Sequence, residues 1–167
     1  PQDKPPTPQL DISWYMETAT EVGGDYYDYT LDSDGSLTVV LGDATGHGMQ
    51  AGTVVTASKT LFQSMGKAPH IIETFSAMSR GLKNMNFPRL GMAMAMIKVE
   101  DKTVRFSSAG MPPMLLWRAD GKHAEEVLLE GMPLGYTALA EYEEIELKMG
   151  AGDTILLMSD GLAERLN

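Results

Sequence analysis

The sequence predicts an α+β fold, an antiparallel β-sandwich flanked by helices. Strand-length apolar segments occupy both ends of the chain, and two longer amphipathic segments lie between them. A hairpin signal, Asp32-Ser33-Asp34-Gly35, separates two of the early segments. Strands on both sides of a helical pair indicate two packed sheets with helices covering an outer face.

The elements before the helical pair are predicted as strands over residues 10–20, 25–31 and 37–41. The hairpin signal makes the last two antiparallel partners. A helix is expected from Gly48 to Gly66, because Val54, Ser58, Leu61, Phe62 and Met65 recur at intervals of three and four.

A second helix is expected from Ile71 to Met85, ending before Pro88, because proline disfavours helical continuation. Six strands follow, over residues 92–99, 103–108, 114–118, 125–129, 143–147 and 154–158. The strands 37–41 and 154–158 are apolar except for one threonine each, which is typical of strands buried on both faces. Most of the 13 methionines fall on apolar faces and are expected in the core.

Composition excludes several classes of protein. The 167 residues are 43% hydrophobic, which fits one globular domain. A net charge of −10 with scattered basic residues argues against nucleic-acid binding. The absence of cysteine excludes disulfides and thiolate chemistry. No apolar run reaches the length of a membrane helix, so we expect no membrane contact by this domain. The absence of cysteine fits a reducing compartment, and a cytoplasmic location is expected.

The two ends suggest a piece of a longer protein. Residues 1–9 hold four prolines and no large apolar side chain, which predicts a linker to another domain. Residues 10–167 form the predicted domain. The sequence after Asp160 begins a helix that stops at Asn167, so the C-terminal end of the domain is expected to be truncated.

Three acids stand at predicted strand ends. Asp43 and Asp160 follow apolar runs directly, and Asp25 follows Gly23-Gly24 at the head of a strand. Carboxylates held on a rigid frame, with oxygen as the ligand atom, suit a hard divalent cation. These spacings predict a metal centre.

The loop 42–48 joins a strand to a helix through three glycines, and its backbone N–H groups could face a phosphate or a metal-bound water. The alternative is a tight turn in which Asp43 caps the helix. The loop matches neither the P-loop nor the dinucleotide-binding pattern.

Taken together, Gly23-Gly24-Asp25, Gly42-Asp43-Ala44-Thr45-Gly46-His47-Gly48, Ser108-Ala109-Gly110, Gly131-Met132-Pro133-Leu134-Gly135 and Ser159-Asp160-Gly161 resemble a known family. It is the SpoIIE-like branch of the metal-dependent (type 2C, PPM) protein serine/threonine phosphatases. The resemblance runs from Leu10 to Leu166 and implies an antiparallel β-sandwich between helices.

The resemblance also implies site roles. Asp43 would bridge two Mg²⁺ or Mn²⁺ ions, and the Ala44 carbonyl would bind one of them. Asp160 would bind the second ion, and Asp25 would act on the first through water. Two such ions can acidify a water and neutralise charge on a phosphoryl group.

Two departures from the family pattern stand out. Met111 occupies a position where the family often has histidine, so it is expected to have no catalytic role. A further acidic ligand of the family falls after the end of this chain.

Other polar residues have simpler interpretations. Asp28 either supports the site or faces solvent, and these alternatives stay open. His47 is expected in the turn, and His70 and His123 are expected on the surface, with no partner acids at metal-ligand spacing. The run 141–146 is expected to be a strand with a solvated acidic face.

The predicted function is hydrolysis of phosphoserine or phosphothreonine on a protein. In the family branch the substrate is usually a STAS-type anti-sigma-factor antagonist in bacterial partner switching, with an upstream sensor domain. A homodimer is left open. The alternative is a phosphatase-like interaction module without turnover, favoured by Met111 and the missing acid.

Overall fold

The computed structural model describes residues 4–17, 23–86 and 90–161. Its elements, in order, are β1 (Asp25–Leu31), β2 (Leu37–Ala44), α1 (Met49–Met65), α2 (Ile71–Asn84), β3 (Met92–Glu100), β4 (Thr103–Ala109), β5 (Met114–Arg118), β6 (His123–Val127), β7 (Ile145–Lys148) and β8 (Thr154–Leu156). One antiparallel sheet has the order β1-β2-β3-β4-β7 and the other has the order β6-β5-β8. The predicted α+β sandwich is confirmed.

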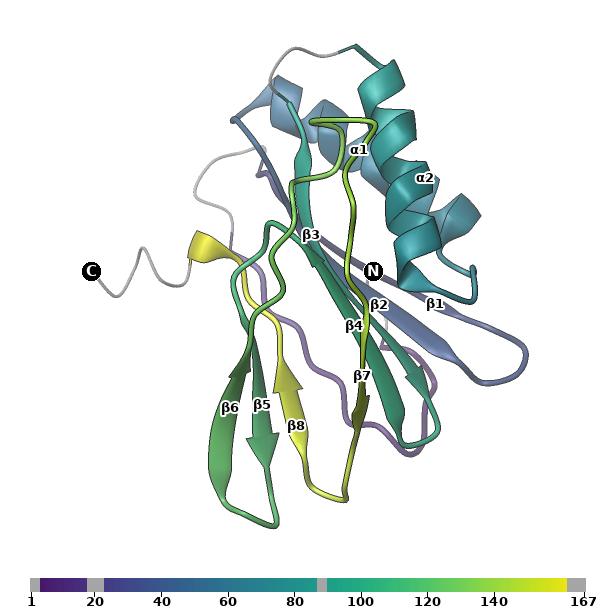
Figure 1. Ribbon diagram of the computed structural model, residues 1–167, viewed down its shortest axis with the longest axis vertical. Helices are drawn as coiled ribbons and strands as arrows, with labels where there is room; N and C mark the ends of the chain where they lie inside the picture. The colour runs from purple at the N-terminus through teal and green to yellow at the C-terminus, as the bar shows by residue number, and fades with distance from the viewer. Residues whose placement is uncertain (1–3, 18–22, 87–89, 162–167) are drawn as a thin grey trace.

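Strand β3 shows how the sequence builds two cores. Met92, Met94 and Met96 alternate with Ala93 and Ala95. Because successive side chains of a strand point to opposite faces, the methionines pack under the helices and the alanines face the second sheet. Both helices therefore lie over one face of the five-stranded sheet (Figure 1), as predicted.

The C-terminal ends of both helices agree with the prediction to within one residue. Helix α1 ends at Met65, directly before Gly66, and α2 ends at Asn84, directly before Met85. Gly35 occupies the left-handed region in the hairpin between β1 and β2 (φ 87°). Its N–H donates to the Asp32 carbonyl, which confirms the predicted turn.

The predicted strand 10–20 is wrong over its described part, since residues 10–17 are irregular. Residues 18–20 lie outside the described residues. Trp14 instead packs its ring on Tyr27 and Tyr29 of β1, with ring centroids 5.4 and 6.1 Å apart. Side-chain stacking, and not a hydrogen-bonded ladder, holds this segment against the sheet.

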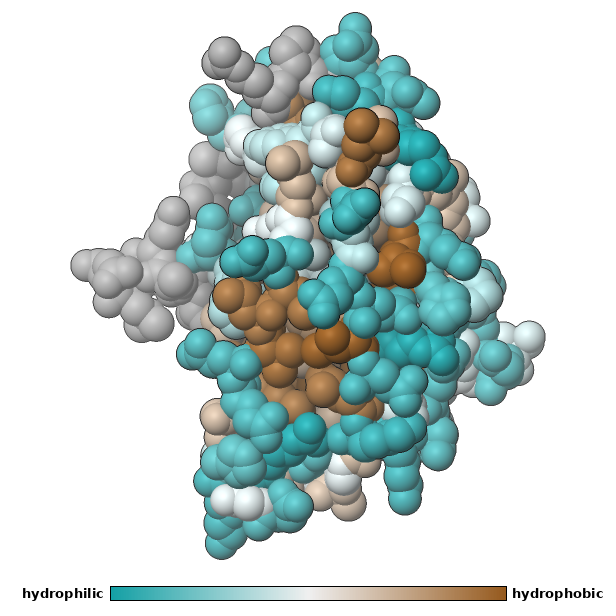
Figure 2. Space-filling view, viewed as in Figure 1, coloured by the Kyte–Doolittle hydropathy of each residue, from teal (hydrophilic) through white to brown (hydrophobic). Residues whose placement is uncertain are grey.

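The predicted strand 154–158 is shortened to three residues in the structure, and it is not buried on both faces. Ile155 faces the core between the sheets, whereas Leu156 is 48% exposed. No helix in the described chain covers the outer side of the three-stranded sheet, and Figure 2 shows apolar side chains gathered over β5 and β8.

The acidic run 141–146 is not the predicted strand, because β7 begins only at Ile145. Glu144 turns toward α2, where its carboxylate accepts the Ile71 N–H at 2.6 Å and lies 3.1 Å from His70 Nδ1. It satisfies a backbone donor at the start of the helix, a place that favours negative charge. His70 is exposed beside the start of α2, as expected.

Candidate metal centre

Two of the predicted acids lie opposite each other. Asp25 begins β1 and is the direct cross-strand partner of Asp43, near the end of β2. Side chains of such a pair leave the sheet on the same face with Cβ atoms roughly 5 Å apart. Asp43 is also the partner of Ala93 on β3, whose side chain packs toward the second sheet. Both carboxylates therefore face the space between the sheets.

Two oxygen atoms lie close to Gly24 beside this pair. A β-carbon added at Gly24 would lie 2.8 Å from the Ala44 carbonyl oxygen and 2.9 Å from Asp43 Oδ1. The Ala44 N–H donates to the Gly24 carbonyl at 2.9 Å, which fixes the two backbones together. A carboxylate and a carbonyl oxygen beside one glycine form the kind of donor set that hard divalent cations take.

The loop after β2 bends sharply to reach the helix. Gly46 (φ 93°) and Gly48 (φ 66°), the N-cap of α1, both adopt left-handed conformations that a side chain would oppose. His47 between them is exposed, in agreement with its predicted place in the turn. The glycines allow α1 to start directly behind the acidic strand end.

Asp160 follows β8 after three irregular residues and is exposed. Figure 1 draws the short turn after β8 on the side of the molecule where β1 begins and β2 ends. Over residues 4–17, 23–86 and 90–161, no three Asp, Glu, His or Cys side chains gather as a metal site. The structure thus brings together Asp25, Asp43 and Ala44, while the role of Asp160 stays a prediction.

Asp28 neither supports the candidate metal site nor faces solvent, the two alternatives that the sequence left open. It lies on the opposite face of β1 from Asp25 and is buried against α1. Its Oδ2 accepts from the Tyr26 hydroxyl at 3.1 Å and from Gln63 Nε2 at 2.9 Å, and lies 3.5 Å from Lys59 Nζ. Burial, and then the charge of Asp28, raises the pKa of Tyr26 well above its usual range. This carboxylate ties the helix to the sheet.

Met111, for which no catalytic role was expected, packs in the apolar core between the two sheets. It is 5% exposed within the core between the sheets, and its N–H donates to Ser108 Oγ at 3.3 Å. The position contributes packing.

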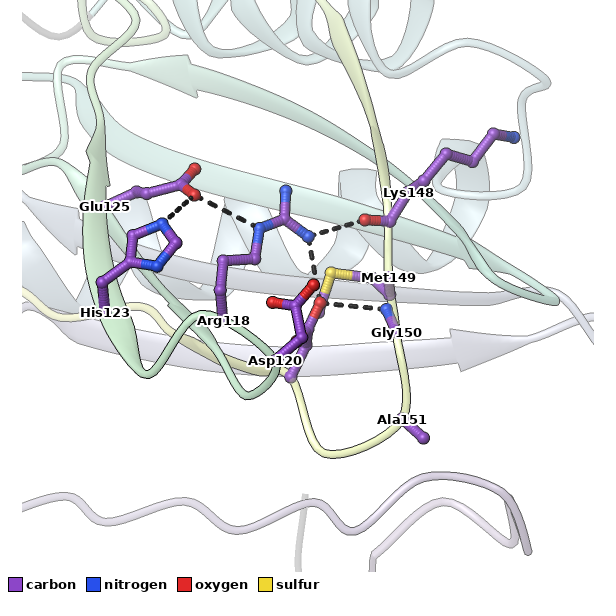
Figure 3. Close-up of a pocket in the computed structure, with 9 residues that line it drawn as sticks. Arg118, Asp120, His123, Glu125, Lys148, Met149, Gly150 and Ala151 are labelled. Atoms are coloured by element: carbon purple, nitrogen blue, oxygen red, sulfur yellow. Dashed lines mark hydrogen bonds and ion pairs between the residues drawn. The ribbon is translucent and has the colours of Figure 1, made fainter.

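A surface pocket of about 440 Å³ lies at the turns joining β5 to β6 and β7 to β8 (Figure 3). Arg118 donates to the Lys148 carbonyl at 2.7 Å and to Asp153 Oδ2 at 3.0 Å, and its Nε lies 3.4 Å from Glu125. His123 also pairs with Glu125, at 2.9 Å, and is exposed, as expected. These mutual contacts tie the two turns together.

None of the helices in the described residues is long and apolar enough to cross a bilayer.

A curated relative, "Phosphoserine phosphatase RsbU" of Bacillus subtilis (strain 168), is 25% identical over 164 residues, or 93% of this chain. The chain spans 47% of the length of that relative.

Solved structures share the fold. The RsbU and RsbW domains of Rv1364c from Mycobacterium tuberculosis match with a TM-score of 0.70 and 28% identity, over 85% of this chain and 40% of that one. RsbX, solved in complex with magnesium, matches with a TM-score of 0.70 and 17% identity, over 86% of this chain and 69% of that one.

The model of one protein family, described as "Stage II sporulation protein E (SpoIIE)", matches residues 33–167, which include β2, both helices and every later strand. The match covers most of the chain, and the motifs and the sandwich agree with it. The chain therefore belongs to the SpoIIE family.

Proposed function

We propose that this chain is the phosphatase domain of a protein serine/threonine phosphatase, acting on phosphoserine or phosphothreonine with two divalent cations, Mn²⁺ or Mg²⁺. The observation that carries the proposal is the cross-strand pairing of Asp25 with Asp43, with the Ala44 carbonyl oxygen and an Asp43 carboxylate oxygen both close to Gly24. The name of the relative RsbU and the magnesium complex of RsbX support it.

Each residue has a task in this proposal. Asp43 and the Ala44 carbonyl would hold the cations, Asp25 would orient water beside them, and Asp160 would complete the site from the second sheet. Glycine at position 24 permits this close approach, because any side chain there would clash with both oxygens. Bound cations would supply positive charge for a phosphoryl group and acidify a water. They would also offset the repulsion between a phosphoprotein and a chain of net charge −10.

The test compares the chain with its Asp43→Asn variant for Mn²⁺-dependent hydrolysis of para-nitrophenyl phosphate. Asp120→Asn, in the distant pocket of Figure 3, is the matched control. We expect a saturable Mn²⁺ dependence in the parent and in Asp120→Asn, and only background hydrolysis in Asp43→Asn. Calorimetric titration with Mn²⁺ should show the same order, and equal rates in all three proteins would refute the proposal.

The substrate we propose is a phosphorylated STAS-type anti-sigma-factor antagonist in a bacterial partner-switching pathway. Support comes from the names of RsbU and of the RsbU and RsbW domains of the solved relative. In the whole protein we propose a cytoplasmic location and an upstream sensor domain. Release of phosphate from a phosphorylated STAS domain, at a rate well above that from a phosphoserine peptide, is the expected result.

The second candidate is an interaction module that binds a phosphoprotein without turnover. Met111 at the often-histidine position favours it, as does the absence of a three-acid cluster among the described residues. Saturable binding of the phosphorylated STAS domain, with no phosphate released at millimolar Mn²⁺, would establish this alternative.

A further inference from the structure

The loop between β2 and α1 is fastened to the start of β3 through Thr45 and Gly91. The Thr45 N–H donates to the Gly91 carbonyl at 2.9 Å. The Thr45 hydroxyl accepts the Gly91 N–H at 2.8 Å and lies 3.3 Å from the Gly91 carbonyl. One threonine thus engages both polar groups of the Gly91 backbone.

Gly91 is itself held firmly on its other side. It is buried, and a β-carbon there would lie 2.6 Å from the Tyr136 ring and 2.7 Å from the Leu134 carbonyl oxygen. Leu134 exchanges two backbone hydrogen bonds with the next residue, Met92, at 2.8 and 3.0 Å. Gly91 therefore gives Thr45 a rigid anchor point.

The geometry of the peptide unit connects this anchor to the candidate metal centre. The Ala44 carbonyl and the Thr45 N–H belong to one planar trans peptide and point in opposite directions. The N–H is directed at Gly91 on the β3 side, so the carbonyl is directed toward Gly24 on the β1 side. Fixing Thr45 on Gly91 sets the direction of the Ala44 carbonyl.

We infer that Thr45 is a positioning residue for the metal centre: its hydroxyl locks the Ala44–Thr45 peptide so that the Ala44 carbonyl stays directed toward Gly24, beside the Asp43 carboxylate. Because the Gly91 N–H is buried, losing its acceptor favours a shift of the loop that finds it another partner. The inference rests on the proposed metal-dependent function. Thr45 contacts neither substrate nor reacting water in this role.

The test uses three substitutions. Thr45→Val keeps the branched shape and removes the hydroxyl, whereas Thr45→Ser keeps the hydroxyl. Thr60→Val makes the same chemical change on the exposed side of α1, where the hydroxyl donates to the Thr56 carbonyl at 3.0 Å. Mn²⁺ affinity is measured by calorimetric titration, metal-free stability by thermal unfolding, and the rate on para-nitrophenyl phosphate as a function of Mn²⁺.

We expect Thr45→Val to weaken Mn²⁺ binding and raise the half-saturating Mn²⁺ concentration about tenfold, while the rate at saturating metal changes little. Thr45→Ser and Thr60→Val should bind Mn²⁺ like the parent. Parental Mn²⁺ affinity in Thr45→Val, or equally weakened affinity in Thr45→Ser, would overturn the inference. If Thr45→Val does not fold, the comparison of Thr45→Ala with Thr45→Ser takes its place.

Failure of the proposed function gives a different result. If the parent chain binds no Mn²⁺, the metal centre and the role of Thr45 are both rejected. If the parent binds Mn²⁺ and the valine variant binds it equally, only the role of Thr45 is rejected.

Discussion

Asp25 and Asp43 are cross-strand partners on β1 and β2, and like charges directly opposite each other are destabilising. We expect Asp25→Asn to stabilise the metal-free protein by about 0.2–1 kcal/mol, because it removes this like-charge pair. Mn²⁺ should raise the unfolding temperature of the parent more than that of the variant. Thermal unfolding with and without Mn²⁺ measures both, and a destabilised metal-free variant would contradict the prediction.

Asp28 is the acid whose removal should cost the most stability. Asp28→Ala leaves the buried Tyr26 hydroxyl and the Gln63 amide without this acceptor, and we expect a loss of about 1–3 kcal/mol in the free energy of unfolding. Lys59→Ala removes only a half-exposed ion-pair partner, so it should cost less than about 1 kcal/mol. Urea unfolding compares them, and equal losses would mean that the ion pair dominates.

Asp153 makes stability depend on pH in the acid range. Hydrogen bonds from the Gly150 and Ala119 N–H groups, and then from Arg118, lower its pKa in the folded protein. The unfolded carboxyl has a pKa of about 3.9. Between the two pKa values the unfolded state binds more protons, so stability falls as pH drops from about 4 through the folded pKa.

Asp153→Asn should therefore lose less stability than the parent between about pH 4 and the acid limit of folding. Urea midpoints measured at a series of pH values test this. Asp120→Asn, whose carboxylate lies in the same pocket, is the control. Parallel pH profiles for the parent and Asp153→Asn would reject the linkage.

At the scale of elements, local periodicity predicted most of the fold. The three- and four-residue spacing of apolar residues located α1 and α2, and the turn signal at Asp32–Gly35 located the first hairpin. The ends of strands were less predictable, because hydrogen bonding to the neighbouring strands determines where a strand ends. Strand β2 continues through Asp43 and Ala44 since both have partners on β3, which no local pattern shows.

The candidate site was partly predictable for the same reason. The hairpin register continues residue by residue from Leu31 and Leu37 back to Asp25 and Asp43, so the turn places these acids opposite each other. The Thr45–Gly91 contact joins residues 46 positions apart. It depends on the pairing of β2 with β3, and sequence spacing therefore could not indicate it.

The alternation in β3 leads to a prediction for the core beneath the helices. Met94 is fully buried there, whereas Met49 at the start of α1 is 87% exposed. We expect Met94→Ala to lower the free energy of unfolding by about 2–5 kcal/mol because it leaves a cavity. Met49→Ala should change it by less than about 0.5 kcal/mol. Urea unfolding distinguishes the two variants. An unchanged free energy of unfolding in Met94→Ala would mean that the helices collapse onto the sheet and fill the cavity.

At the scale of the whole molecule, the two faces of the sandwich differ. The five-stranded sheet has α1 and α2 on its outer face, while the described chain leaves Trp117, Leu128 and Leu156 exposed around the three-stranded sheet. The N-terminal segment adds cover at the other edge, where Pro5 is buried and Trp14 packs on β1. The N-terminal segment therefore packs through Trp14 on the strand that bears Asp25.

This packing predicts that the N-terminal segment contributes to the stability of the whole domain. Trp14→Ala removes two aromatic contacts, with Tyr27 and Tyr29, each worth about 0.5–1.5 kcal/mol beyond the buried area. Tyr15→Ala, at the neighbouring and 82% exposed position, should have little effect. Far-UV circular dichroism in urea gives the free energies of unfolding of both variants.

Because Tyr27 and Tyr29 lie on the same face of β1 as Asp25, loosening of this face in Trp14→Ala should also weaken Mn²⁺ binding. Unchanged stability and Mn²⁺ affinity in Trp14→Ala would show that the segment is only a tether.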